Sequence, residues 1–318
     1  MTTQSVATLG IEKIKSQSLS PGELAWQRFR HHRMALVGAG VLLGLILYVL
    51  VGALFFSETT ANRGDLRSTL LGPSISHPFG TDLAGRDILI RTIFGGQISI
   101  IIGILAVIVS VTVGVLIGAL AGYFGGTIDS LLMRFTEAMF NIPQLFLLIV
   151  LAKFFGANTP TFTFLGREFS GSVVVIVGVI GLTSWMYLAR IVRSSFLSLK
   201  EQEFVTAAHA TGATDLSIIF EHILPSAMAP IIVSATLEVA NAILAEAYIS
   251  FLGMGVQPPT ATWGNMLNEA YNHLDGAPWM WFFPGTLILL IVLAINFVGD
   301  GLRDAIDPRS VRLTRSKE

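Results

Sequence analysis

Long apolar runs separated by short polar segments dominate the chain. Each run is long enough to cross a bilayer, because a helix rises ~1.5 Å per residue and the hydrocarbon core is ~30 Å thick. They predict membrane-spanning helices at residues 34–56, 98–121, 131–155, 172–192, 229–252 and 281–298. The expected fold class is therefore all-α, a polytopic membrane protein with six transmembrane helices.

The composition agrees with this pattern. Hydrophobic residues make up 53% of the 318 residues and charged residues only 13%, a balance that a soluble protein's polar surface cannot cover. The first apolar run follows 33 residues and is too long for a signal-peptide core, so we expect it to stay in the mature chain. Cysteine is absent, which excludes disulfides and thiolate metal sites, and a net charge of −1 gives no reason to expect nucleic acid.

Basic residues predict the orientation, because cytoplasmic flanks are enriched in Lys and Arg. They precede the first span and follow the last: Lys13, Lys15, Arg28, Arg30 and Arg33, then Arg303, Arg309, Arg312, Arg315 and Lys317. Both termini are thus expected to be cytoplasmic, with residues 122–130 and 193–228 also inside. The expected division is a cytoplasmic segment at 1–33, a first helix with its outer loop at 34–96, a core at 97–303 and a cytoplasmic tail at 304–318.

The N-terminal segment "SPGELAWQRFRHHRMAL" mixes aromatic and basic residues. Ser20 is a candidate helix cap, and Pro21 suits a first helical position. The segment predicts a short interfacial helix with Trp26 and Phe29 in the headgroup layer. A basic flank without such a role is the open alternative.

The inside segment at 193–228 is the longest polar stretch between spans. Its part "EFVTAAHATGATDLSIIFEHILP" predicts two helices with a break at Gly212, Thr214 capping the second, and an end before Pro225. Small Ala side chains allow close backbone approach, and Gly212 can take a positive φ at the turn. Such a surface suits docking into a partner's groove, and an amphipathic connector on the membrane is the alternative.

Polar residues inside the spans should face protein or water, since charge at bilayer depth costs at least ~2.5–3.5 kcal/mol. Glu238, Asn241 and Ala245 share one helical face, and Glu246 is turned away from it. Glu238 and Asn241 either line a pathway or bond between helices, while Glu246 has a gating or a packing role.

The third span holds two further features of note. Arg134 and Glu137 are spaced to pair on one helix face. Pro143 is expected to kink or interrupt the span.

The first outer loop contains "FGTDLAGRDILIR" directly before the second span. Asp82, Arg86 and Asp87 are expected to form salt bridges and caps that fix this segment. Contact with a molecule that binds or passes at the outer face is the alternative role.

Several of these stretches together resemble a known family. "EFVTAAHATGATDLSIIFEHILP" is similar to the EAA loop of permease subunits in binding-protein-dependent ABC importers, and the matching residues are Glu203, Ala207, Ala208, Gly212, Ile223, Leu224 and Pro225. "HPFGTDLAGRDILIRTIFGGQIS", "SFLGMGVQPPTATWGNML" and "GDGLRDAIDPR" resemble the C-type chain of the dipeptide/oligopeptide (nickel, glutathione) transporter group. In the first of these the outer-loop motif comprises Gly80, Asp82, Gly85, Arg86 and Asp87.

The resemblance implies a type I ABC importer permease fold in a prokaryotic inner membrane. Its implied partners are a homologous permease subunit, two cytoplasmic ATP-binding subunits and an extracytoplasmic solute-binding protein. ATP and Mg would bind the ATPases, since this chain has no G-x-x-x-x-G-K-[ST], no catalytic constellation and no metal-site pattern. Dipeptides or oligopeptides are the expected solutes, with nickel chelates, glutathione or another small solute open. An ion-coupled carrier using Glu238 and Glu246 is the competing class.

Overall fold

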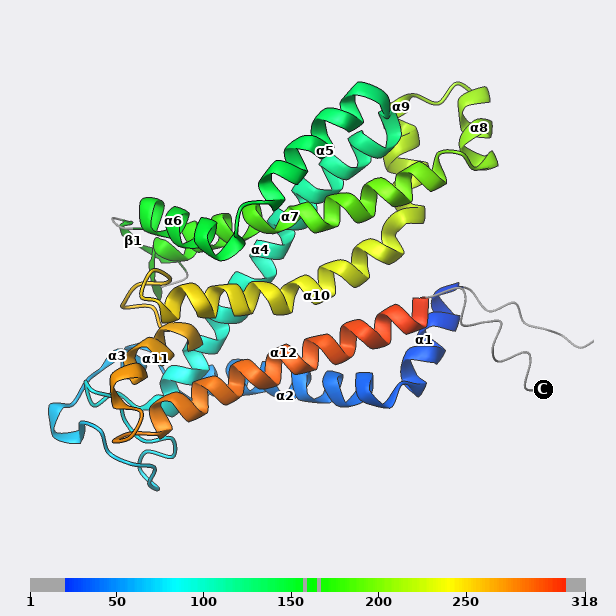
Figure 1. Cartoon of the computed structure of the whole chain (residues 1–318). Helices are drawn as coiled ribbons and strands as arrows, with labels where there is room; N and C mark the ends of the chain where they lie inside the picture. The colour runs from blue at the N-terminus through cyan, green and yellow to red at the C-terminus, as the bar shows by residue number, and fades with distance from the viewer. Residues whose placement is uncertain (1–20, 157–158, 165–166, 307–318) are drawn as a thin grey trace, which may run out of the picture.

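The structure, a computed structural model, describes residues 21–156, 159–164 and 167–306 and is built almost entirely from helices (Figure 1). The long helices are α1 (Pro21–His31), α2 (Arg33–Phe55), α4 (Ile88–Phe124), α5 (Gly126–Phe140), α6 (Gln144–Gly156), α7 (Ser172–Leu199), α10 (Leu224–Phe251) and α12 (Trp279–Ile306). The shorter elements are α3 (Glu58–Asn62), η1 (Leu66–Ser68), β1 (Thr161–Phe164), β2 (Arg167–Ser170), α8 (Glu203–Ala210), α9 (Asp215–Ser217), η2 (Ile218–Ile223), α11 (Trp263–Ala270) and η3 (Tyr271–His273).

The predicted spans are present, and several are longer than expected. Five helices of the described residues are each long and apolar enough to cross a membrane, and the pair α5 and α6 makes a sixth if it counts as one span. That pair is bent by 84° between Phe140 and Gln144, which confirms the predicted interruption at Pro143. The second span begins at Ile88 because the Asp87 side chain accepts the Ile90 N–H at 3.1 Å and caps the helix.

The predicted helix end before Pro225 is wrong. Residues 215–251 form one continuous apolar helix through α9, η2 and α10. Its η2 section is π-helical, so the Leu224 N–H donates to the Ile219 carbonyl five residues back. Pro225 then lies in the first turn of α10, where its missing N–H costs little, and the wide turn lets the chain pass the proline without a break.

The core forms where α4 packs along α7 and where α10 packs against α4, α7 and α12. A Cβ on Gly118 or Gly122 of α4 would collide with backbone or side-chain atoms of α7, and a Cβ on Gly114 would be crowded by Trp185 and Leu188 of α7. This glycine stripe, residues 114, 118 and 122, explains how the two helices approach so closely. α2 packs against α12, and α10 lies between these two helices and α7 (Figure 1).

The two ends of the bundle carry different elements. Figure 1 shows α1, the end of α12, α8 and α9 at one end, and α3, α11 and the β-hairpin at the other. The antiparallel hairpin pairs Thr161 with Ser170 and was not anticipated from the sequence, nor was α11. α11 begins with a capping box between Thr262 and Asn265.

The N-terminal helix α1 begins at Pro21, as predicted, and Trp26 stacks on Phe29 with ring centroids 6.1 Å apart. Ser20 and the tail at 307–318 lie outside the described residues. The predicted pairing of Arg134 with Glu137 is wrong: no ion pair joins them in the described chain. The ion pair that α5 does form joins Asp129 to Arg193 of α7 through two hydrogen bonds, whereas an exposed pair along one helix face would add little stability.

Candidate functional site

The inside loop presents α8 beyond the ends of the long helices (Figure 1). α8 ends at Ala210, and Gly212 follows with φ of +87°. The Thr214 hydroxyl then accepts the Ser217 N–H at 3.4 Å and starts α9. The predicted two helices with a glycine break and a Thr214 cap are confirmed, and the turn presents α8 as a separate element.

An apolar cluster holds the loop to the transmembrane core. Val205 of α8 and Ile218 of η2 are buried with Val192 and Phe196 of α7. A polar tie adds to it, since the Tyr123 hydroxyl at the end of α4 donates to Asp215 at 2.7 Å. The loop is thus fixed to α4, α7 and α10 together. Tyr123 was not identified from the sequence, because its partner lies 92 residues away.

The predicted loop residues divide into exposed and buried positions. Glu203, Ala207, Gly212 and Pro225 are exposed, Ala208 and Leu224 are half-buried, and Ile223 is fully buried in the apolar cluster. The exposed positions can meet a partner, while Ala208 and Ile223 act in this structure through packing within the loop.

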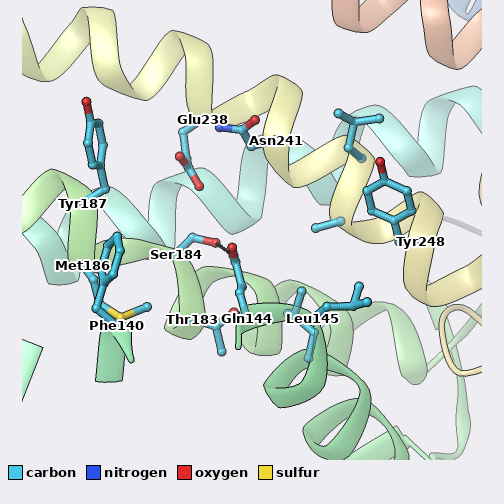
Figure 2. A pocket seen from close by; sticks show the side chains of 13 residues that line it. Phe140, Gln144, Leu145, Thr183, Ser184, Met186, Tyr187, Glu238, Asn241 and Tyr248 are labelled. Carbon is cyan, nitrogen blue, oxygen red and sulfur yellow. Dashed lines mark hydrogen bonds between the residues drawn. The ribbon is translucent and has the colours of Figure 1, made fainter. Parts of the chain in front are cut away.

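A second candidate site is a hollow of 610 Å³ between α6, α7 and α10, which we call the central hollow. Its lining comprises Phe140, Gln144, Leu145, Leu148, Thr183, Ser184, Met186, Tyr187, Glu238, Asn241, Leu244, Ala245 and Tyr248. Figure 2 shows Glu238 pointing from α10 toward Ser184 of α7 and Gln144 of α6. The Gln144 amide donates to the Ser184 hydroxyl at 3.3 Å. The predicted shared face of Glu238, Asn241 and Ala245 is confirmed, since all three line this hollow.

Glu246 lies away from the central hollow and is fully buried. Its carboxylate accepts hydrogen bonds from the hydroxyls of Ser250 at 2.7 Å and Ser99 at 3.1 Å. The Ser99 hydroxyl in turn accepts the Trp263 N–H at 3.2 Å. Glu246 therefore joins α10, α4 and the start of α11, and these contacts favour the packing role of the two expected for it.

The outer-loop motif forms an ionic network with α11. Arg86 binds Asp82 at 2.6 Å and Glu269 at 2.8 Å, and the buried Arg91 reaches the same two carboxylates at 3.3 and 3.1 Å. Glu269 was not identified from the sequence, since it follows the outer loop by 183 residues. The network fixes the outer loop against α4 and α11, in line with the structural reading of Asp82 and Arg86.

The remaining motif residues shape the same loop. Asp87 caps α4 and binds His77 at 2.8 Å. Gly80 and Gly85 have φ of +75° and +71°, and a Cβ on Gly85 would collide with the Asp65 carbonyl. Glycine is thus required at both turns. Among the described residues no three His, Asp or Glu side chains converge as a metal site.

Comparisons with known proteins agree with this arrangement. The family model described as "Binding-protein-dependent transport system inner membrane component" matches residues 114–312, and "N-terminal TM domain of oligopeptide transport permease C" matches residues 20–79. The chain is 39% identical over 300 residues to the "Oligopeptide transport system permease protein OppC" of Escherichia coli (strain K12), covering 94% of each chain. It is also 39% identical to the "Dipeptide transport system permease protein DppC" of Bacillus subtilis (strain 168), covering 94% of this chain and 89% of the relative.

The fold has a relative among solved structures. A chain of the MetNI methionine ABC transporter in an inward-facing conformation superposes with a TM-score of 0.50 at 16% identity, covering 67% of this chain and 94% of that one. At that identity the match concerns the fold alone. The apolar helices, the loop geometry and the sequence matches together show that this chain belongs to the inner-membrane components of binding-protein-dependent transport systems, as a multi-pass permease of the bacterial inner membrane.

Proposed function

We propose that this chain is one of two permease subunits of an ATP-driven importer of dipeptides or oligopeptides, and that α8 docks its ATPase. The small exposed helix that stands beyond the bundle and is anchored to three long helices is the observation that carries this proposal. The names of the relatives, oligopeptide and dipeptide permeases, support the solute class. A homologous permease, two ATP-binding subunits and an external solute-binding protein complete the transporter, with ATP and Mg bound by the ATPases.

The anchoring of α8 suggests how ATP binding moves the pathway. Closure of the ATPase pair displaces α8, and the buried contacts of Val205 and Ile218 transmit the displacement to α7 and α10. Because packed helices move as rigid bodies between discrete arrangements, the central hollow between these helices opens alternately to either side. The ATPase drives the cycle by favouring one arrangement when ATP is bound.

Docking is tested by placing a bulky side chain on the exposed face of α8. Ala207→Trp should abolish co-purification of the ATPase while the sister permease stays bound, since Ala207 is exposed and a large ring cannot enter a groove shaped for a methyl group. Ala207→Ser is the matched control and should retain the ATPase. Retention of the ATPase by Ala207→Trp, with unchanged hydrolysis, would contradict docking through α8.

An ion-coupled carrier is the second candidate, favoured by the Glu238 carboxylate that faces the central hollow. Uptake into proteoliposomes that contain the complete complex distinguishes an ATP-driven importer from an ion-coupled carrier. Vanadate should stop uptake of a labelled tripeptide, and a protonophore should not. The opposite pattern would exclude the ATP-driven importer.

A further inference from the structure

Glu238 is placed unlike any other described carboxylate of the spans. It lies near the middle of α10, is only half-buried, and lines both the central hollow and a second hollow of 640 Å³ toward the α12 end. Tyr187 and Asn241 are likewise shared by the two hollows. The carboxylate therefore stands where the two spaces meet, at a depth where a charge needs a partner or water.

Among the described residues no basic side chain forms an ion pair with Glu238. The lining of the central hollow contains no Lys, Arg or His. Arg303 lines the second hollow, yet no ion pair joins it to Glu238 in the part of the chain that the structure describes. Asp129 and Glu58, by contrast, are each paired with an arginine. Glu238 is left available for a positive charge that comes from outside the chain.

The groups around Glu238 match one kind of cation. Asn241 and Ser184 lie beside its carboxylate in the central hollow (Figure 2), and the Gln144 amide donates to the Ser184 hydroxyl. Their amide and hydroxyl oxygens, with the carboxylate, form a set of acceptors. A primary ammonium carries three donors and no acceptor, so it can use such a set fully.

Aromatic rings complete the surroundings. Phe140, Tyr187 and Tyr248 line the same hollow (Figure 2). The Phe140 ring already carries the Arg190 guanidinium, 4.4 Å from its centroid, so Tyr187 and Tyr248 are the rings that can attract a desolvated ammonium. The cluster of Gln144, Ser184, Glu238 and Asn241 is here called the ammonium subsite.

We propose that the ammonium subsite receives a primary ammonium of the passing solute, with Glu238 as the residue that makes the pathway prefer cationic over anionic groups there. This rests on the proposed function, in which the solute is a peptide. The ammonium is then the peptide's N-terminus or a lysine side chain, which share this chemistry.

The absence of cysteine from the chain allows a direct test. Ala245→Cys places a thiol in the central hollow of the complete purified complex. The thiol is modified with one of two methanethiosulfonates: the aminoethyl compound, which carries an ammonium, or the sulfonatoethyl compound, which is anionic. The increase in the mass of this chain measures the extent of modification. The modification rate with the ammonium reagent should be at least ten times the rate with the anionic reagent. In the double variant that also carries Glu238→Gln, the two rates should be equal. Glu137→Gln, an exposed carboxylate of α5 outside the hollow, is the matched control and should leave the preference unchanged.

Peptides distinguish the two sources of the ammonium. Tri-alanine should protect Ala245→Cys from modification, N-acetyl-tri-alanine should not, and N-acetyl-Ala-Lys-Ala should protect only if a side-chain ammonium is also accepted. Protection by tri-alanine should be lost with Glu238→Gln. Asn241→Asp, which adds a second carboxylate, should raise the preference for the cationic reagent and provides the test if Glu238→Gln fails to assemble.

A reagent preference that Glu238→Gln or Asn241→Asp leaves unchanged would overturn the proposal, and would indicate that a cation of the sister permease neutralises Glu238. The proposed function is judged separately, from vanadate-sensitive tripeptide uptake by the same wild-type complex. Labelling requires no ATP, so either idea can fail alone.

Discussion

Glu246 is the residue whose removal we expect to destabilise the bundle most clearly. Its buried carboxylate accepts from Ser250 and Ser99. Glu246→Ala leaves these hydroxyls without their acceptor and opens a cavity, and should cost about 2–4 kcal/mol. Thermal unfolding of the purified complex measures this, and Glu137→Ala, which changes an exposed carboxylate, should melt like the wild type. Equal melting of the two variants would contradict the packing role of Glu246.

Gly212 separates backbone strain from surface shape. Its φ of +87° disfavours residues other than glycine, yet a Cβ there would have no atom within 4 Å. Gly212→Asn should therefore retain ATPase binding, since Asn tolerates a positive φ. Gly212→Val should strain the turn and weaken the binding free energy for the ATPase by roughly 1–2 kcal/mol. ATPase binding to the purified permease pair, titrated for both variants, is the measurement. Equal affinity for both would show that the left-handed turn is not needed for docking.

The sequence predicted the positions of single residues correctly where all of them lie on one helix and follow its period. The 3.6-residue period placed Glu238 and Asn241 on one face, and that face lines the central hollow. Ser184 and Gln144 complete the same site from α7 and α6 and were missed. Their contacts depend on how helices far apart in the chain cross, which no local period encodes.

At the scale of elements, the glycine stripe of α4 sets the distance to α7. A Cβ on Gly118 would collide with the Ala189 carbonyl and Val192. Gly118→Ala should therefore destabilise by about 1–3 kcal/mol through overpacking, despite the higher helix propensity of alanine. Gly44→Ala is the matched control, because Gly44 is exposed on α2 with nothing within 4 Å of a Cβ. A melting temperature that falls for both variants, or for neither, would contradict close packing as the reason for Gly118.

The elements themselves were predicted well in kind and less well in extent. Apolar length identified every span, and Pro143 marked the break between α5 and α6. The continuation of the helix through Pro225 depends on a π-helical turn, in which Ile218 and Ile219 are buried, and a π-helical turn has no signature in apolar length. α11 contains only eight residues, Trp263–Ala270, and is stabilised by its contacts with α10 and α12, so its local pattern is weak.

At the scale of the whole molecule, the ends of the bundle are distinct. α1 packs against α12, where Arg28 donates to the Ala305 carbonyl at 3.3 Å and His32 pairs with Asp304 at 3.4 Å. Both described chain ends thus lie at the end that carries α8, and the ionic network of Arg86, Arg91 and Glu269 lies at the other. This segregation suits a protein that receives solute on one face and couples to an ATPase on the other.

Whether the bent pair α5 and α6 crosses the membrane decides whether the first outer loop and the α8 loop face opposite sides of it. Between Ile75 in the first outer loop and Glu201 before α8 lie α4, the bent pair and α7. If the pair crosses, the two positions are on opposite sides, and if it turns back they share a side. Because the chain has no cysteine, Ile75→Cys and Glu201→Cys each provide a single thiol at an exposed position.

We expect a membrane-impermeant maleimide to label Ile75→Cys in intact spheroplasts and Glu201→Cys only after permeabilisation, since positive flanks place both termini and the α8 loop inside. The cysteine-free parent chain, which should take no label, is the control. Labelling of both positions from outside would contradict the placement of the first outer loop and α8 at opposite ends of the bundle, and with it a membrane crossing by the bent pair. The reverse pattern would invert the molecule and move α8 away from any cytoplasmic ATPase, so one pair of thiols tests the span count and the orientation at once.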